Sequence, residues 1–319
     1  MDRRTSVVAV VSTTLALTAC GGGGSNVPDD SVAIGVYPAS ALSLPIYVAD
    51  QQGMFDDQGL VVELINGKSG PELITALIGG TTEIAVGAPG TVVPAIQQGQ
   101  HLRLLPPYGS IDLSIAVTED SGITGLEELP GKRVAVPARG GAAEQFVTEL
   151  LTEEGIDPSN VQFIAAAPTA SQIPLARKGD VDAAVLTFAS RAAFEAQGVS
   201  MEPITSVTEG TAGEVGSYGL GTVLVASGTL AESDAAEPVC AALSAAGEWI
   251  ADPTNKEAGT ELLVKTMNVP ADKAAEVWAA QMQLWPEQIA EERWRHNVEW
   301  VNDQTSGARE KDVPFDPVC

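Results

Sequence analysis

The feature that most constrains the fold is a sequence pattern that occurs twice, 99 residues apart, at Gly80 and at Gly179. Gly80 to Val86, followed after eleven residues by Gln98-Gly99, is matched by Gly179 to Val185 and, at the same spacing, Gln197-Gly198. Around each copy, strand-like and helix-like segments alternate, and glycine ends helix after helix. Each half is therefore predicted to be strand, helix, strand, helix, strand, helix.

This alternation favours an α/β fold with parallel sheets covered by helices on both faces. Two equivalent halves predict two doubly wound lobes. A single large sheet with similar units by chance is the alternative, which the identical spacing disfavours. Ligands of doubly wound sheets bind outside the carboxyl ends of the strands, so two facing lobes would form a cleft. Glu83 and Asp182 precede their strands at the opposite end and are expected to serve turns rather than catalysis.

Two apolar strands outside the repeat are predicted to carry the chain between the lobes. They are Leu113 to Thr118 and Leu220 to Ala226, the second preceded by a loop at Gly213 to Tyr218. The expected boundaries are residues 31–117 for the first part of lobe 1, 118–218 for lobe 2 and 219–319 for the return to lobe 1.

The segment after Ser227 is helical in pattern, and its helices are expected to pack on the first lobe. Four tryptophans are predicted to make this contact: Trp278, Trp285, Trp294 and Trp300. A position in the cleft is the alternative for Trp285.

Residues 1–19 have the features of an export signal. Arg3 and Arg4 precede an apolar run, Val7 to Leu17, that is too short to span a bilayer, and Leu17-Thr18-Ala19-Cys20 follows. This tetrapeptide resembles the lipobox of bacterial lipoproteins. The resemblance implies cleavage before Cys20, lipidation of Cys20 and a glycine-rich tether over residues 20–30, on the outer face of the cytoplasmic membrane. An ordinary secretory signal with a chance cysteine is the alternative.

Charge excludes several classes of partner. The chain has 17 Lys and Arg against 42 Asp and Glu, a formal charge of −25. Loss of the signal removes Asp2, Arg3 and Arg4, a net +1, so the mature charge is −26. Such a chain is not expected to bind nucleic acid, or to contact the membrane except through its lipid anchor.

The remaining cysteines, Cys240 and Cys319, are predicted to form a disulfide in an oxidising compartment, with two free thiols as the alternative. His101 and His296 are the only histidines and are far apart in sequence, so neither a metal site nor a cofactor is expected.

Several short segments occur in a distinctive order along nearly the whole mature chain. They are Pro45 to Ala49, Gly53-Met54-Phe55, Gly59 to Val62, Gly70-Pro71, Gly80 to Val86 with Gly99, Leu126 to Val136 and Gly179 to Ala183. Their arrangement resembles the solute-binding proteins of bacterial ABC importers with the periplasmic-binding-protein type II fold. The similarity is to the aliphatic sulfonate, taurine and nitrate binders, a group that also includes thiamine-pyrimidine binders. It implies a monomer that captures a small-molecule solute by lobe closure and delivers it to an ABC permease in the cytoplasmic membrane.

The resemblance also implies that ligand contacts come from the turns after the strands. The predicted ligand-binding residues are Tyr37, Ser40, Ser43, Ala88, Pro89, Arg139, Gly140, Gly141, Thr187, Phe188 and Tyr218. Each serine is either a ligand donor or a helix N-cap. Arg139 lies between a predicted strand, Lys132 to Val136, and a predicted helix, Ala142 to Glu154, whose N-terminus offers free N–H groups.

The solute class is left open by two departures from the family pattern. Sulfonate binders of the family tend to have a hydroxyl-rich turn at the second-lobe helix and a Trp-Asp-Pro-like stretch after the repeated strand. Here these places read Ala138 to Ala142 and Thr187-Phe188-Ala189. They fit a sulfonate or carboxylate held by Arg139, or a more apolar molecule with Arg139 in solvent.

Two other functions are alternatives to solute transport. An enzyme is disfavoured because the sequence has no G-x-S-x-G elbow, no P-loop and no cysteine-rich motif of the related pyrimidine-synthesising enzymes. A surface lipoprotein that binds a macromolecule is the second alternative, and composition does not exclude it.

Overall fold

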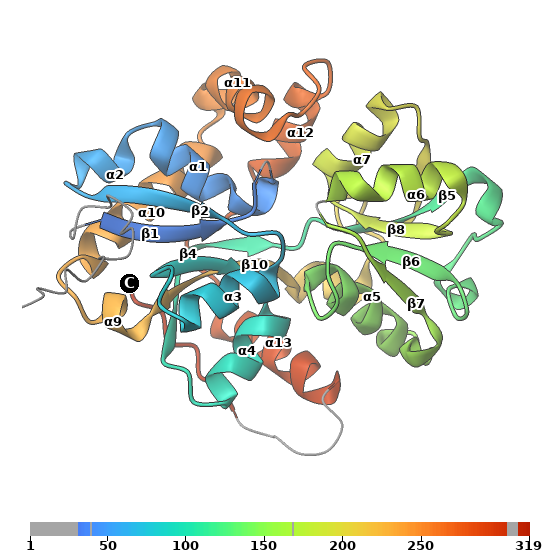
Figure 1. Cartoon of the computed structure of the whole chain (residues 1–319), viewed down its shortest axis with the longest axis horizontal. Coiled ribbons are helices and arrows are strands. Elements are labelled where there is room, and N and C mark those ends of the chain that lie inside the picture. The colour runs from blue at the N-terminus through green and yellow to red at the C-terminus, as the bar shows by residue number, and fades with distance from the viewer. Residues whose placement is uncertain (1–30, 39, 168, 305–311) are drawn as a thin grey trace, which may run out of the picture.

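The computed structural model describes residues 31–304 and 312–319 except residues 39 and 168, and it consists of two α/β lobes (Figure 1). The predicted signal, Cys20 and the tether lie outside the described residues. Within the described part, no helix is both long and apolar enough to cross a membrane.

The first lobe is built on a five-stranded sheet in the order β2-β1-β3-β10-β4. Its strands are β1 (Ser31–Val36), β2 (Val61–Asn66), β3 (Ile84–Gly87), β4 (Leu102–Ser110) and β10 (Leu220–Ser227). The connecting helices are α1 (Leu44–Gln51), α2 (Met54–Asp57), α3 (Gly70–Ile78) and α4 (Pro89–Gln97). A short 3₁₀ turn, Ala41–Ser43, precedes α1.

The second lobe is built on a sheet in the order β7-β6-β8-β5-β9. Its strands are β5 (Ser114–Thr118), β6 (Arg133–Val136), β7 (Gln162–Ala165), β8 (Ala183–Leu186) and β9 (Met201–Ser206). Its helices are α5 (Ala142–Glu153), α6 (Gln172–Lys178), α7 (Phe188–Ala196) and α8 (Gly213–Tyr218). The order β7-β6-β8 repeats β2-β1-β3, so the sequence repeat corresponds to two equivalent parallel units.

The prediction of parallel sheets is wrong for β5 and β10, two strands outside the repeat. β10 runs antiparallel to β3 and β4, and β5 runs antiparallel to β8 and β9. Both β5 and β10 enter from the other lobe and therefore start at the end of the sheet where the parallel strands finish. Each sheet is thus mixed.

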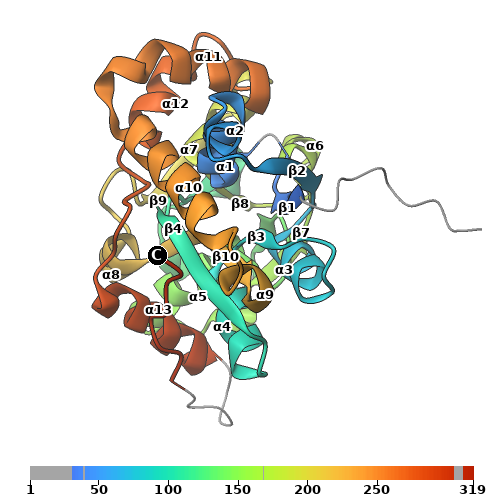
Figure 2. The same cartoon turned by 90° about the vertical axis from the view of Figure 1, so that its left-hand side faces the viewer.

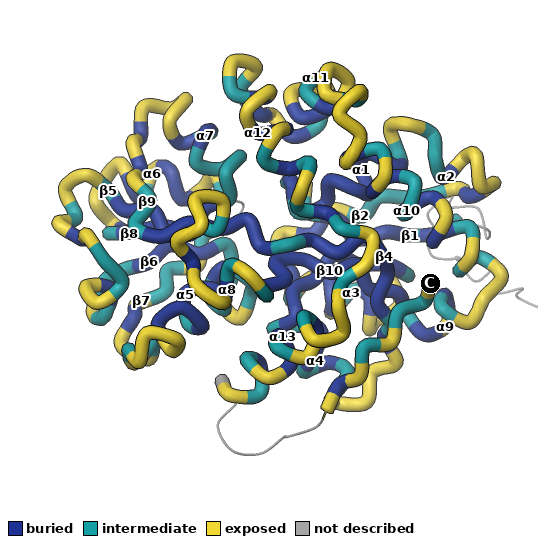
Figure 3. The backbone as a smooth tube through the Cα atoms, turned by 180° about the vertical axis from the view of Figure 1, so that it is seen from behind, coloured by how far each residue is buried: buried dark blue, intermediate teal, exposed yellow. Residues whose placement is uncertain are grey.

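Both faces of the second sheet are buried under apolar clusters. Side chains alternate along a strand, so neighbouring residues of one strand join different clusters. On β6, Val134 and Val136 join one apolar cluster, whereas Ala135 joins another. The first cluster includes Phe146 of α5, and the second includes Phe194 of α7. Dark blue segments through the middle of both lobes mark the buried strands (Figure 3).

The C-terminal part forms a series of helices that contact both lobes. They are α9 (Gly228–Ala231), α10 (Ala236–Ala251), α11 (Lys256–Met267), α12 (Ala274–Gln281) and α13 (Glu291–Gln304). Trp278, Trp285 and Trp294 belong to the first-lobe core, as predicted. Trp300 instead packs against the second-lobe core, because α13 extends past the junction to reach α8. The expectation that all four tryptophans pack on the first lobe is therefore wrong for Trp300.

The C-terminal tail is fastened along β4. Cys240 and Cys319 form a disulfide with an S–S distance of 1.97 Å, the pairing predicted from the sequence. The Val318 N–H donates to the Leu104 carbonyl at 2.8 Å, and the C-terminus lies beside β4 and α9 (Figure 2). The tail thus covers the outer edge of the first sheet.

Candidate ligand site between the lobes

The chain passes between the lobes at two adjacent places. One crossing is Ile111 to Leu113, between β4 and β5, and the other is Tyr218-Gly219, between α8 and β10. The Ile111 N–H donates to the Gly219 carbonyl at 3.2 Å. The first crossing precedes β5, which belongs wholly to the second sheet, and so it lies a few residues before the boundary expected at Val117.

The carboxyl ends of the strands in the two lobes face the same space. The N–H of Gly90, at the start of α4, donates to Oε1 of Gln145 on α5 at 2.9 Å, across the junction. Phe188 lies two residues after the end of β8. Its N–H donates to Asp112 in the first crossing at 3.4 Å. We therefore take the space between these turns as the candidate ligand site.

In the first-lobe turn, both predicted serines are used to hold the backbone. Ser43 is fully buried and its Oγ accepts the Tyr37 N–H at 2.9 Å, while Oγ of Ser40 accepts the Leu42 N–H at 3.3 Å. Ser40 is thus an N-cap, the alternative role considered for it. The Tyr37 hydroxyl lies so close to Gly70 that a Cβ there would be 2.7 Å from it. Burial raises the pKa of Tyr37.

The second first-lobe turn offers little free donor capacity. Ala88 is buried and caps α4, and Pro89 at the first helical position has no N–H. The Ala88 carbonyl accepts the Thr91 N–H and hydroxyl, both at 2.9 Å. The turn therefore presents Gly90 toward the second lobe, where Gln145 accepts its N–H.

In the second-lobe turn, Arg139 is paired with a residue of the same lobe. Its side chain is 62% exposed and makes a bidentate contact with Glu144, with Nε to Oε2 at 2.7 Å and Nη2 to Oε1 at 3.0 Å. The Gly140 N–H donates to the same carboxylate at 2.9 Å. Gly140 has φ 68°, a left-handed conformation that glycine adopts at no steric cost, and Gly141 is the N-cap of α5. The hydrogen bonds that Arg139 donates to Glu144 raise the pKa of Arg139.

The predicted residues near α7 and the second crossing have separate roles. Thr187 caps α7 by accepting the Ser190 N–H at 3.1 Å. The Phe188 ring lies under the Arg191 guanidinium, 5.3 Å from the ring centroid, and packs against the first-lobe core. Tyr218 stacks on His296 of α13, with ring centroids 4.2 Å apart. Thr187 and Phe188 are thus at the junction, whereas the Tyr218 ring is held by α13.

Asp112, which the sequence reasoning missed, lies buried where the two lobes meet. Its Oδ2 accepts the Gln281 amide of α12 at 2.9 Å, and its Oδ1 accepts the Phe188 N–H. Burial raises the pKa of Asp112 to about 6, while these hydrogen bonds and the charge of Arg191 act in the opposite direction. The sequence signal that could have identified Asp112 is its position between two apolar residues, Ile111 and Leu113.

The lobes are packed together beside the crossings. A cavity of about 10 Å³ lies there, lined by residues of α5, both crossings and α13, among them Gln145, Gly219 and Asn297. Such a space has room for about one water molecule.

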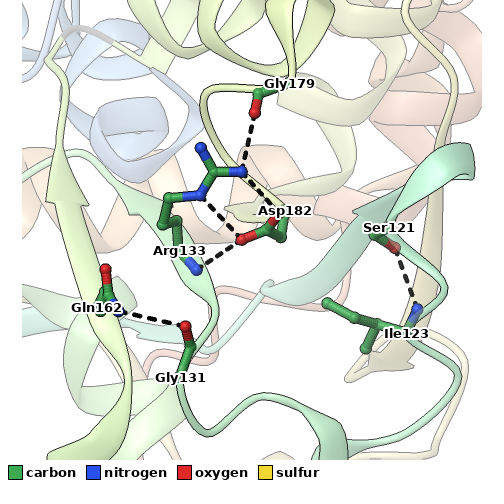
Figure 4. Close-up of polar contacts among 7 residues, drawn as sticks. All are labelled: Ser121, Ile123, Gly131, Arg133, Gln162, Gly179 and Asp182. Carbon is green, nitrogen blue, oxygen red and sulfur yellow. Dashed lines mark hydrogen bonds and ion pairs between the residues drawn. The ribbon is translucent and has the colours of Figure 1, made fainter.

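The equivalent carboxylates of the repeat, Glu83 and Asp182, hold turns at the opposite end of the sheets. Oδ2 of Asp182 accepts the Arg133 N–H at 2.9 Å, and Oδ1 contacts the Arg133 side chain at 2.8 Å (Figure 4). Oε2 of Glu83 accepts the Ala33 N–H at 3.3 Å. Both carboxylates thus bind the first strand of their repeat unit, β1 or β6, which agrees with the turn role predicted for them. In the described part of the chain, no group of three or more His, Cys, Asp or Glu could hold a metal ion.

Comparison with known proteins finds one matching family model and several solved structures of similar fold. A model of the family described as NMT1/THI5 like matches residues 41–255. The alkanesulfonate-binding protein SsuA of Xanthomonas axonopodis pv. citri, bound to MOPS, has a TM-score of 0.71 and 17% identity, over 87% of this chain and 93% of that one. The aliphatic sulphonate binding protein SsuA of Escherichia coli has a TM-score of 0.66 and 20% identity, over 87% and 88%.

The nitrate-binding protein NrtA of Synechocystis PCC 6803 has a TM-score of 0.63 and 16% identity, over 77% of this chain and 69% of that one. At these identities the likeness shows a shared fold, and it confirms the predicted two-lobe periplasmic-binding-protein architecture. No curated protein sequence matches the chain.

Proposed function

The chain belongs to the NMT1/THI5-like family, and from this premise we propose that it is the extracytoplasmic solute-binding protein of an ABC importer. The protein captures a small organic solute between its lobes and presents the closed form to a permease in the cytoplasmic membrane. Export and attachment through a lipidated Cys20 belong to the same proposal, as does a monomeric state.

The observation that carries the proposal is the meeting of strand-end turns from both lobes beside two adjacent crossings. Gly90 and Gln145 come from opposite lobes, and the bond between them is 2.9 Å long. The crossings at Ile111 and Gly219 are joined by one hydrogen bond. Two lobes that are joined at one side can rotate apart there and admit a solute to the turns.

Binding rather than catalysis fits the chemistry of the groups present. The paired carboxylates of the repeat, Glu83 and Asp182, accept backbone N–H groups away from the cleft. Asp112 is held by Gln281 and Phe188 at the crossing. Each of these carboxylates therefore has a structural partner, which supports capture without turnover.

Mass spectrometry of the solute released from gently purified, then denatured, mature protein tests the proposal. We expect one small organic molecule per chain. Adding that molecule back to stripped protein should raise the melting temperature saturably, because a ligand that binds only the folded state stabilises it. A protein that carries no solute and shows no shift in a broad metabolite screen, yet captures a macromolecule stably, would contradict the proposal. Chemical conversion of the added molecule would instead indicate an enzyme.

The lipid anchor has its own test. Replacement of Cys20 by Ser should release the exported protein from the membrane fraction into the soluble fraction. Wild-type protein that is already soluble, with an unmodified N-terminal cysteine, would contradict the anchor and leave solute binding unaffected.

A further inference from the structure

We propose that Glu144 is a specificity-determining residue that keeps oxyanions out of the second-lobe turn, so that the solute carries no anionic group at this end of the cleft. This inference rests on the proposed function, because it concerns the solute held between the lobes. It sets this chain apart from the structurally similar proteins described above, whose named ligands are sulfonates and nitrate.

The Glu144 carboxylate binds donors that would otherwise be open to an oxyanion. An oxyanion at a helix N-terminus is held by backbone N–H groups and by a nearby Arg fork. Here the Gly140 N–H and the Nε and Nη2 groups of Arg139 already bind Glu144, at distances between 2.7 and 3.0 Å. The Glu144 side chain is only 17% exposed. The charge of Arg139 is therefore paired, and the Gly140 N–H and one edge of the Arg139 guanidinium are already bound within the protein.

The sequence explains why Glu144 reaches this position. Gly141 is the N-cap of α5, so Glu144 is the third helical residue, from which a side chain reaches back to the N–H groups before the helix. The same carboxylate lies at the N-terminal end of the helix, where the helix dipole attracts a negative charge. An incoming sulfonate would have to displace the Glu144 carboxylate. Because this carboxylate is covalently part of the helix, it binds these donors without the entropy cost of capturing a free ion from solution.

The other strand-end turns are also supplied with internal acceptors. Gln145 accepts the Gly90 N–H, and Ser43 accepts the Tyr37 N–H. The Phe188 N–H is bound by a second carboxylate, Asp112. An oxyanion would therefore meet one acceptor after another, two of them carboxyl groups.

A second cation at the junction, Arg191, is also paired with a carboxylate. Nη1 of Arg191 lies 3.1 Å from Oε1 of Glu209, and its guanidinium covers the Phe188 ring. Neither Arg139 nor Arg191 is left as a free counter-charge for an anionic solute. Recognition through apolar surface and uncharged polar groups is the chemistry that remains for these turns.

The experiment measures binding of hexanesulfonate and of nitrate to stripped mature protein by isothermal titration calorimetry. We expect no saturable binding to the wild type. Glu144→Gln keeps the shape of the side chain but frees the charge of Arg139, so this variant should gain hexanesulfonate binding at least tenfold tighter than any wild-type signal. Glu154→Gln, an exposed position at the other end of α5, is the matched control and should behave as the wild type.

Wild-type protein that binds hexanesulfonate as tightly as Glu144→Gln would overturn the inference, as would a folded Glu144→Gln variant that gains nothing. Melting temperatures show whether each variant is folded. The chemical class of the released solute is a second readout that needs no variant. A released sulfonate or carboxylate would overturn the role of Glu144 while supporting the proposed function, whereas the absence of any solute would count against the proposed function itself.

Discussion

At the residue scale, the group that links both lobes most directly is the Asp112 carboxylate. It lies in the first crossing and accepts hydrogen bonds from Phe188 of the second lobe and from Gln281 of α12. Desolvation by burial raises its pKa to about 6 from an ordinary value of 3.8. Between these two pH values the side chain is therefore more fully protonated in the folded protein than in the unfolded chain, despite the nearby charge of Arg191.

This shift predicts a pH-dependent stability. Because the folded-state pKa is raised, the favourable contribution of Asp112 is present below about pH 3.8 and is lost as the pH rises through about 6. Asp112→Asn cannot ionise, so the free energy of unfolding of this variant, relative to that of the wild type, should increase by about 2 kcal/mol between pH 4 and pH 8. Denaturant titrations at several pH values measure the difference.

Asp120→Asn, at an exposed position, is the control for the loss of one carboxylate and should show no such trend. A constant difference between Asp112→Asn and the wild type across this range would mean that Asp112 titrates normally.

At the scale of elements, α13 fixes the second crossing. Arg293 donates to the Tyr218 carbonyl at 3.1 Å and to the Gly219 carbonyl at 2.8 Å. Asn297 donates to Tyr218 at 2.9 Å and accepts the Leu220 N–H at 3.1 Å. The helix therefore sets the direction in which the chain leaves α8 and enters β10.

Asn297→Ala should destabilise the protein by about 1–3 kcal/mol, because it leaves the buried Leu220 N–H without its acceptor. Urea denaturation gives the loss directly. Glu291→Ala, an exposed change in the first turn of the same helix, serves as the control. Equal losses of unfolding free energy for the two variants would assign the effect to α13 as a whole rather than to the hydrogen bonds of Asn297.

The disulfide between Cys240 and Cys319 gives a further prediction at this scale. It closes a segment of 79 residues, and a loop of that length is stabilised by about 4 kcal/mol in the chain-entropy model. The double variant Cys240→Ser, Cys319→Ser should unfold at a lower denaturant concentration by an amount approaching that value. Unchanged unfolding would mean that the tail is held by its contacts along β4 alone.

The elements of the repeat could be predicted because each one has a local signal. Gly155 ends one helix in the left-handed conformation, as predicted, and Gly59 and Gly179 are of the same kind. Elements whose stability comes from packing were missed. Gly213 to Tyr218 looked like a loop because of its two glycines, yet it forms α8, since Val215 packs in the second-lobe core. The edge strand β9 contains Pro203 and carries no clear strand pattern.

The candidate site was predictable only in part, for a related reason. The turns at the strand ends follow from the repeat, but the partners of their N–H groups do not. Gln145 is 55 residues from Gly90, and Gln281 is 169 residues from Asp112. Such pairs depend on how the lobes and the C-terminal helices pack against each other. Local patterns in a single sequence do not reveal that packing. The role of Glu144, five residues from Arg139, was within reach of local reasoning.

At the scale of the whole molecule, the lobes are joined by the two crossings and by contacts on either side of them. The Gly90–Gln145 bond lies on one side, and on the other Lys273, at the N-cap of α12, contacts Glu195 of α7 at 3.3 Å. Separation of the lobes must break both contacts. The ion pair is partly exposed and contributes little, so the energy that resists opening comes mainly from the buried junction.

Small-angle X-ray scattering of stripped mature protein, with and without its released solute, tests the central claim of capture by lobe closure most directly. The account predicts that the solute reduces the radius of gyration and narrows the distribution of interatomic distances, as rotation about the adjacent crossings brings the lobes together. Profiles that superimpose at a saturating concentration of a solute shown to bind would contradict capture by closure.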